Sequence, residues 1–404
     1  MKTVLVVGAG RYQRAVIRKG RELGFRVAAV DRNPEAPGLA LADIPRVVDF
    51  RSPEAVLENV RDLEIDGVLT VQAERAVPMV AAIAEALGLP GIGAETARLM
   101  TNKLAMRARL ADRGIPQPRF ATVRRPAEAR TAAREIGFPA VLKPADSAGQ
   151  VGLARVESVD DAEASFSDAA AASPTGEAVL EEYVEGTEMN GIVVVQDGEV
   201  LAVFLCDRLR PPGRGFGVSW LHVYPPTPEG AQLAEAERVA ADAVQALGLR
   251  NGLGFPQLIA KPDGGVVVVE CAARIGGMMA EHLLHAFGID LLEVALRLAL
   301  GEPIAQDHVR ERFRRPVAIR FLTADPGTLS PGRVTRVGPL DDVLASPGVL
   351  AAEVYSEVGE TIRPVRIISD RRGYVIATGE TRGEAVERAD AATALVDIEV
   401  SPSG

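Results

Sequence analysis

The chain has 404 residues, enough for two to four domains, and its hydrophobic fraction of 47% and charged fraction of 25% are typical of a soluble globular protein. The net charge of −10 argues against a nucleic-acid partner, because an acidic protein gains nothing from releasing counterions. Cys206 and Cys271 form no CxxC pair, which argues against a disulfide framework or a zinc finger. No apolar run reaches the length of a membrane span, and the first residues lack the regions of a signal peptide, so we expect a cytoplasmic protein with no membrane partner.

The first hundred residues predict a small doubly wound α/β domain. A buried strand over residues 3–7 ends at Gly8-Ala9-Gly10, a helix follows over 11–23, and a second strand over 26–30 ends at Asp31. The pattern then repeats, which predicts a parallel sheet with helices on its faces. The repeated elements are strands at 46–49 and 67–71 and helices at 53–63 and 76–87.

The glycine turn of this first unit is also compatible with dinucleotide binding. Gly8 and Gly10, followed by Asp31 about twenty positions later, are features of such a site. Gln13 occupies the third glycine position, where close packing of helix on strand needs no side chain. We therefore favour a plain structural turn and keep a nucleotide-binding oxidoreductase as an alternative.

The middle and end of the chain mix strands and helices. Glycine and proline divide this region into short elements, without repeats or a long linker. The predicted helices cover 160–172, 228–247, 281–300 and 382–395, and a basic helix begins near 100. The predicted strands cover 140–143, 152–156, 178–183, 190–196, 200–208 and 220–224, with a hairpin over 252–269.

A lysine and a loop of small residues form the first chemical pattern. Lys143 ends a strand, and Ser147 and Gly149 lie in the loop that follows. Backbone N–H groups of such a loop can bind nucleotide phosphates while the lysine neutralises their charge. Lys103, at the start of a helix, is a second candidate for the same role.

The acidic segment 181–188 forms the second pattern, at the end of a strand. A backbone carbonyl and an N–H group two residues apart can imitate a base pair with adenine, and a carboxylate a few residues later can accept both ribose hydroxyls. A solvated acidic edge is the alternative interpretation.

The third pattern is a hairpin that carries a candidate metal site. If Asp263-Gly264 is a two-residue turn, Gln257 lies opposite Glu270 on the neighbouring strand. One oxygen from each could share Mg²⁺, which prefers oxygen ligands. Alternation along the strand places Arg274 on the same face as Glu270.

Arg274 also begins the fourth pattern, Arg274-Ile275-Gly276-Gly277, where a strand gives way to a helix. An arginine here can bind a carboxylate or an acyl-phosphate through two parallel hydrogen bonds. The four histidines show no metal-ligand spacing and are interpreted as packing or surface residues: His222, His282, His285 and His308.

In this order, the patterns resemble the ATP-grasp superfamily, in particular the carbamoyl-phosphate-synthetase-type branch with bacterial L-amino acid ligases and, more distantly, biotin carboxylase. The resemblance covers essentially the whole chain. It implies a pre-ATP-grasp domain over 1–98, an ATP-grasp domain over 99–300 with a phosphate-lid subdomain at about 115–182, and a C-terminal α+β domain over 301–404. The segments that carry it are 101–103, 114–118, 138–144, 181–188, 270–274 and 373–385.

The resemblance also implies roles for individual residues. Lys103 and Lys143 would contact the phosphates of ATP, and Arg274 would stabilise an acyl-phosphate and its adduct. Gln257 and Glu270 would ligate Mg²⁺. The adenine and ribose would be bound by the carbonyl of Glu182, the N–H of Val184, the nearby Glu181, and Glu188.

Two residues depart from the family pattern. Gln257 stands where many members have a carboxylate, and Ala272 replaces the usual asparagine ligand, so the number of Mg²⁺ ions is left open. The expected activity is ATP-dependent joining of a small carboxylate, such as an amino acid, to an amine. Bicarbonate activation and a non-catalytic ATP sensor remain alternatives, and a homodimer is one option for the assembly. The substrate pockets depend on side chains from loops such as 207–220, and no spacing rule identifies the acid or the amine from such loops.

Overall fold

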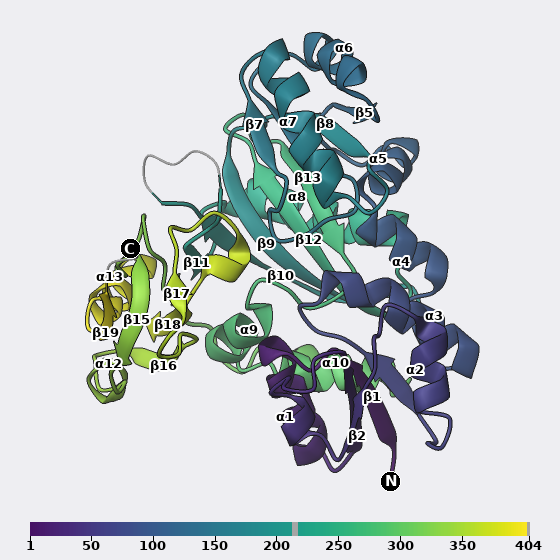
Figure 1. Cartoon of the computed structure of the whole chain (residues 1–404), viewed down its shortest axis with the longest axis vertical. Coiled ribbons are helices and arrows are strands. Elements are labelled where there is room, and N and C mark those ends of the chain that lie inside the picture. Colours follow the sequence, from purple (N-terminus) through teal and green to yellow (C-terminus); the bar gives the residue numbers. More distant parts are fainter. Residues whose placement is uncertain (212–216, 402–404) are drawn as a thin grey trace.

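The computed structural model describes residues 1–211 and 217–401, so part of the loop 207–220 lies outside the described residues. Three lobes surround the helices α9 (Met279–Phe287) and α10 (Leu291–Ala299), with the N-terminal lobe at the bottom of Figure 1 and the C-terminal lobe at its left. The mixed α/β architecture confirms the predicted fold class. None of the helices in the described part of the chain has both the length and the apolar character needed to cross a bilayer.

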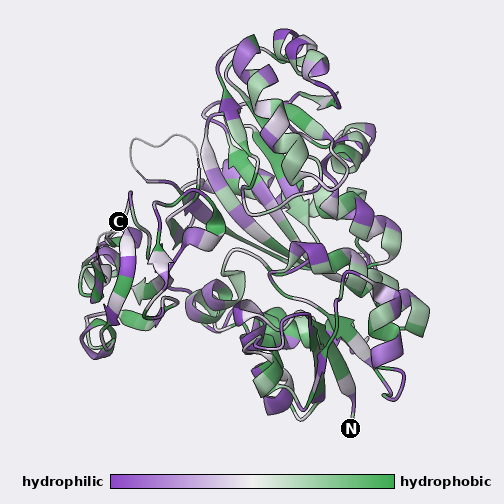
Figure 2. Cartoon of the chain, in the orientation of Figure 1, coloured by the Kyte–Doolittle hydropathy of each residue, from purple (hydrophilic) through white to green (hydrophobic). Residues whose placement is uncertain are grey.

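The N-terminal lobe is the predicted doubly wound unit. Its four strands are all parallel, in the order β3-β2-β1-β4. Strand β1 is buried along its whole length and is coloured mostly hydrophobic in Figure 2. The elements are β1 (Thr3–Val7), η1 (Arg11–Gln13), α1 (Arg14–Glu22), β2 (Arg26–Asp31), η2 (Leu39–Leu41), β3 (Ile44–Val47), α2 (Pro53–Asn59), β4 (Gly67–Leu69), η3 (Glu74–Ala76) and α3 (Val77–Leu87).

The glycine turn after β1 is occupied by the protein's own side chains. The Gln13 amide donates to the carbonyl of Val71 at 2.5 Å, and a Cβ added at Gly10 would lie 3.2 Å from its Oε1. Asp31 accepts the backbone N–H groups of Ala9 and Asn33. These contacts favour the structural interpretation of the turn over the dinucleotide site.

A four-stranded antiparallel sheet, in the order β5-β8-β6-β7, forms the upper lobe of Figure 1 with two helices packed on it. Helices α4 (Ala94–Thr101) and α5 (Lys103–Asp112) precede it. The remaining elements are β5 (Phe120–Val123), α6 (Pro126–Ile136), β6 (Ala140–Pro144), β7 (Ala154–Val156), α7 (Val159–Ala172) and β8 (Ala178–Glu182).

An eight-stranded antiparallel sheet forms the centre of the molecule, in the order β13-β12-β9-β10-β11-β14-β18-β16. Val193 and Val195 of β9 pack in one hydrophobic cluster with α8, while Ile192 and Val194 pack in another with α9 and α10. This alternation buries both faces of the strand. The elements are β9 (Thr187–Gln196), β10 (Glu199–Leu209), β11 (Leu221–Tyr224), α8 (Gly230–Ala246), β12 (Gly252–Ala260), β13 (Val266–Ala272), β14 (Val317–Phe321), β16 (Val349–Val354) and β18 (Gly373–Thr378).

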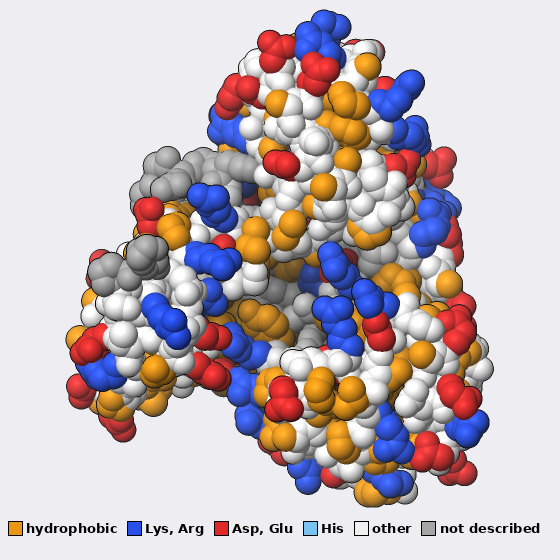
Figure 3. All heavy atoms as spheres, viewed as in Figure 1, with side chains coloured by type: hydrophobic (Ala, Val, Ile, Leu, Met, Phe, Trp, Pro, Cys, Tyr) orange, Lys and Arg blue, Asp and Glu red, His pale blue; other side chains and the backbone are white. Residues whose placement is uncertain are grey.

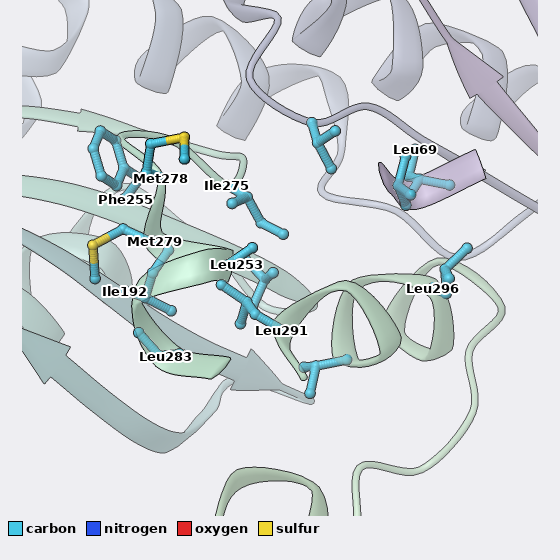
Figure 4. Packing of buried hydrophobic residues seen from close by; sticks show 14 of the residues in the cluster. Leu69, Ile192, Leu253, Phe255, Ile275, Met278, Met279, Leu283, Leu291 and Leu296 are labelled. Atoms are coloured by element: carbon cyan, nitrogen blue, oxygen red, sulfur yellow. The ribbon is translucent and has the colours of Figure 1, made fainter. Parts of the chain in front are cut away.

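The segment 281–300, predicted as one helix, contains parts of two. Gly288 ends α9 with a left-handed φ of 72°, and the Asp290 side chain caps α10 by accepting the N–H groups of Leu292 and Glu293. The break lets α10 pack against the N-terminal sheet while α9 packs against the central one. Figure 4 shows Leu291 and Leu296 of α10, with Leu69 of β4 nearby and Met279 and Leu283 of α9 against the central strands.

The C-terminal lobe joins the central sheet directly, since β14 pairs with β11 and β18 pairs with β14. The sheet therefore continues past residue 300, where the sequence predicts a domain boundary; that boundary remains a prediction. A second sheet, β17-β15-β19, completes the lobe. The other elements are α11 (Gln306–Val309), β15 (Gly332–Val337), α12 (Asp341–Leu344), β17 (Thr361–Ile362), η4 (Ile368–Asp370), α13 (Arg382–Thr393) and β19 (Ile398–Ser401).

Candidate active site

One pocket between the upper lobe and the central sheet brings together the residues to which the sequence analysis assigned ATP, Mg²⁺ and acyl-phosphate contacts. Figure 3 shows a hollow between the three lobes with Lys and Arg side chains around it. A concentration of positive charge in a hollow attracts anionic ligands. The predicted residues that line the pocket are Lys103, Lys143, Ser147, Gly149, Glu181, Glu182, Val184, Glu188, Gln257, Glu270 and Arg274.

Lys143 lies in the buried strand β6, with its side chain aligned by a carboxylate. Its Nζ lies 2.6 Å from Oε2 of Glu181 on the neighbouring strand β8. Burial lowers the pKa of Lys143, and the Glu181 carboxylate opposes that shift. For Glu181, burial raises the pKa, but Arg107 and Lys143 outweigh it and bring the pKa to about 2. The Glu181 carboxylate is therefore ionised at neutral pH.

Lys103 connects the small-residue loop to the hairpin. It is the first residue of α5, which Asn102 caps by accepting the N–H of Ala105 at 3.0 Å. Its Nζ donates to the carbonyl of Ser147 at 2.8 Å and lies 3.2 Å from Oε1 of Glu270. Both lysines thus face one pocket from different secondary-structure elements.

The hairpin places Gln257 opposite Glu270, as predicted, but by a different route. The turn is one residue longer than predicted, because Lys261 pairs with Gly265 around Pro262–Gly264. That change alone would shift the pairing by one residue. A β-bulge at Val269 restores it, since Leu258 pairs with Val268 while Gln257 pairs with Glu270.

Gln257 and Glu270 offer a small donor set for a cation. The Gln257 Nε2 donates to Oδ1 of Asn190 at 3.3 Å, which leaves the amide carbonyl as the atom able to bind a cation. Burial raises the pKa of Glu270, but Lys103 and Lys143 outweigh it, so the net shift is downward and the carboxylate stays ionised. Within residues 1–211 and 217–401, no group of three or more His, Cys, Asp or Glu side chains could hold a metal ion. The residues therefore fit Mg²⁺ only if phosphate and water supply most of its ligands.

The segment 181–188 serves several functions in the structure. Glu181 is 1% exposed. One of its carboxylate oxygens accepts a hydrogen bond from Arg107, and the other forms an ion pair with Lys143. The side chain of Glu182 pairs with Arg119, and Glu182 is one of the residues that line the pocket. The proposed adenine contact uses the backbone carbonyl of Glu182, so the ion pair of its side chain is compatible with it.

Glu188 lies in β9 and forms ion pairs with Arg208 of β10 and with Arg210, which follows the end of that strand. Any ribose contact made by Glu188 would therefore share its carboxylate with these two arginines. Burial lowers the pKa of Arg208 to about 10, which leaves it charged at neutral pH.

Arg274 pairs with a residue that the sequence did not indicate. Its NH2 lies 2.6 Å from Oε2 of Glu74 in the N-terminal lobe, and its guanidinium carbon lies 5.1 Å from the centre of the Phe255 ring. Its Nε and NH1 have no hydrogen-bond partner among the described residues. A Cβ at Gly276 would lie 1.9 Å from that NH1, so glycine leaves the space that the guanidinium occupies. The cation closest to Glu270 is Lys103, while Arg274 lies next to Glu74.

A second group of residues lines the pocket, and no sequence motif assigned a role to any of them individually. Arg371, from the C-terminal lobe, donates to the carbonyl and hydroxyl of Ser219 at 2.6 and 2.7 Å. His222 lies within 3.2 Å of the same hydroxyl and 3.4 Å of Asn190. Burial lowers the pKa of His222 well below its ordinary value, so the ring is neutral. The interpretation of His222 as a packing residue overlooked its place in the pocket wall.

Two protein-family profiles match this chain, one over the region that holds most of the pocket residues and one over the C-terminal lobe. The sequence profile described as the carbamoyl-phosphate synthase L chain, ATP binding domain, matches residues 102–307, about half of the chain. The profile described as the L-amino acid ligase C-terminal domain 2 matches residues 320–401.

Individual proteins show the same likeness. A formate-dependent phosphoribosylglycinamide formyltransferase of Ignicoccus hospitalis is 26% identical over 98% of this chain and 95% of its own length. An L-arginine-specific L-amino acid ligase of Bacillus subtilis is 25% identical over 68% of this chain and 66% of its own length. The crystal structure of an L-amino acid ligase from Bacillus licheniformis shares the fold, with a TM-score of 0.85 and 22% identity over 99% of both chains.

Proposed function

Since this chain belongs to the family of the carbamoyl-phosphate synthase L chain ATP-binding domain, within the ATP-grasp carboxylate–amine ligases, we propose that it joins an amino acid or a similar small acid to an amine, using ATP. One observation carries the proposal. Two buried lysines, each beside a carboxylate, face the same pocket as the Gln257–Glu270 pair and Arg274. Cations placed in this way suit the transfer of a phosphoryl group to a carboxylate.

In the first step, an oxygen of the acid attacks the γ-phosphorus of ATP, and the bond to the bridging oxygen of ADP breaks. Lys103 and Lys143 would neutralise the charge that spreads over the phosphate oxygens. Gln257 and Glu270 would hold Mg²⁺, which would supply further positive charge. The products of this step are an acyl-phosphate and ADP.

In the second step, the amine attacks the acyl carbon, the bond to phosphate breaks, and an amide forms. Within residues 1–211 and 217–401, the Nε and NH1 of Arg274 have no hydrogen-bond partner, and they could bind the developing oxyanion. Glu74 would orient the guanidinium through its ion pair. The loop 145–152 would cover the acyl-phosphate and exclude water.

A screen of acids against amines tests the proposal directly. ADP release should require MgATP and an acid, amide formation should also require an amine, and hydroxylamine should trap the acyl-phosphate as a hydroxamate. An Arg109→Lys variant is a suitable control, since Arg109 is a partly exposed side chain that pairs with Glu95 outside the pocket. Tight MgATP binding without ADP release across the whole screen would instead indicate a nucleotide sensor.

A second candidate is formate as the acid and a phosphate-bearing amine as its partner. The match of formate-dependent formyltransferases to nearly the whole chain favours it. The chemistry is the same, because formyl phosphate is an acyl-phosphate. Including formate in the screen separates the two candidates by the acid that gives the highest kcat/KM.

A further inference from the structure

Arg107, a fully buried arginine of α5, does not line the pocket, yet it contacts Glu181, the carboxylate partner of Lys143, and the strand that carries Glu270. We propose that Arg107 is a positioning residue that sets the geometry of Lys143 and Glu270 together. The proposal rests on the proposed function, since it assigns these two residues to the binding of MgATP. No sequence pattern indicated Arg107.

The first contact is with the lysine's carboxylate partner. Arg107 Nε donates to Oε1 of Glu181 at 2.8 Å, and Oε2 of the same carboxylate lies 2.6 Å from Nζ of Lys143. The three charges lie in a row, with arginine and glutamate each 1% exposed. Because water does not screen them, the orientation of Glu181 depends on Arg107, and that of Lys143 depends on Glu181.

The second contact is with the β-bulge that sets the hairpin register. Arg107 NH1 donates to the carbonyl of Val268 at 2.9 Å, and NH2 donates to the carbonyl of Val269 at 2.5 Å. Val269 is the extra residue of the bulge and directly precedes Glu270. A bulge disrupts the ladder locally, so its carbonyls need other donors. By supplying them, Arg107 stabilises the arrangement in which Glu270 faces Gln257.

The linker after α5 completes the environment of the guanidinium. NH1 also donates to Oε1 of Gln117 at 3.2 Å, while Gln117 Nε2 donates back to the carbonyl of Arg107 at 2.9 Å. Acceptors therefore surround one planar group in several directions. A lysine has one nitrogen and cannot reproduce the planar fork whose three nitrogens meet acceptors on both strands and on the linker. Charge alone would not replace this arginine.

The test compares Arg107→Lys with Arg109→Lys, which makes the same change two residues later on the same helix. MgATP binding is measured by calorimetry, with the number of sites giving the competent fraction, and turnover is expressed per competent site. For Arg107→Lys we expect a dissociation constant for MgATP and a half-saturating Mg²⁺ concentration about 10- to 100-fold higher, as is typical when a partner of a metal ligand is lost. Arg109→Lys should match the wild type.

A purely structural role predicts a different result. Arg107→Lys would then show a lower melting temperature and fewer binding sites, but wild-type affinity and turnover at each remaining site, and this would overturn the proposal. MgATP binding requires neither acid nor amine. A chain that binds MgATP with the expected Arg107 dependence but forms no amide would leave the positioning role intact while refuting the proposed function.

If Arg107→Lys does not fold, the Arg107→Met/Glu181→Gln double variant removes both charges of the Arg107–Glu181 pair, so neither of these two stays buried without the other. Lys143 loses its carboxylate partner in this variant and in Glu181→Gln alike. Its MgATP affinity is compared with that of Glu181→Gln alone. A further loss of about tenfold or more in the double variant supports the separate contact with the bulge. Equal affinities would show that Arg107 acts only through Glu181 and would overturn the claim that it positions Glu270.

Discussion

Replacing Glu181 with glutamine should change how the stability of the protein depends on pH. The pKa of Glu181 is about 2 in the folded protein against an ordinary value of 4.5, because Arg107 and Lys143 outweigh the effect of burial. A lowered folded-state pKa gives stability that is present above pH 4.5 and is lost as the pH falls toward 2. The shift corresponds to about 3 kcal/mol at neutral pH, of which about 2 kcal/mol is lost by pH 3.

The measurement is urea unfolding of the wild type and of Glu181→Gln at several pH values. The glutamine has no titrating proton, so the difference in unfolding free energy between the two proteins should be largest near pH 7 and smaller by about 2 kcal/mol at pH 3. Glu177→Gln serves as a control, because Glu177 pairs with the exposed Arg124 and its loss should cost under about 1 kcal/mol. A difference between wild type and Glu181→Gln that stays constant from pH 7 to pH 3 would refute the reasoning.

Four further predictions concern the pocket. Lys143→Ala and Glu270→Ala should each lower ADP release by about 100-fold or more without unfolding the protein, and near-normal turnover with a native melting curve would contradict the site. Arg274→Lys should lose more turnover than ATP affinity, because a lysine lacks the planar pair of donors; lost ATP affinity with full turnover at saturating ATP would place the residue in the nucleotide site instead. Gly276→Ala should reproduce that pattern, since the added Cβ overlaps the guanidinium, and an unchanged turnover would show that the arginine can move aside without consequence. Residues 145–152 should exchange amide hydrogens faster without nucleotide than with ATP, and equal rates in both states would contradict a nucleotide-ordered loop.

In the hairpin, the predicted pairing of Gln257 with Glu270 is correct, but the turn from which it was predicted is not the one in the structure. The sequence predicts that Gln257 faces Glu270 from a two-residue turn, and the structure pairs them across a three-residue turn with a bulge. A bulge leaves little trace in a run of valines, because any of them could be the extra residue. Its position depends on the Arg107 guanidinium, which donates to the carbonyls of the bulge, and on the linker carbonyl of Pro116, which accepts the N–H of Val268.

The prediction of a single helix over 281–300 was wrong for a different reason. The apolar pattern continues through the break, and only Gly288 followed by Asp290 signals an end and a new start. Two hydrophobic surfaces that face different sheets require the change of direction. The helical periodicity of the segment does not predict which of the two sheets each turn of helix packs against.

By itself the sequence determined the buried parallel strands of the first lobe, the order of the motifs and one part of the pocket lining. These features depend on local alternation, turn residues and short spacings, which the backbone converts directly into position. Only the tertiary structure decided which charge neutralises which. Arg274 lies beside Glu74, Lys143 beside Glu181, and Arg371 reaches the pocket from the C-terminal lobe. Ion pairs between residues far apart in the chain produce no periodic pattern in the sequence. Each charged side chain could pair with many oppositely charged residues, and only the packing of the lobes determines which of them lies close enough.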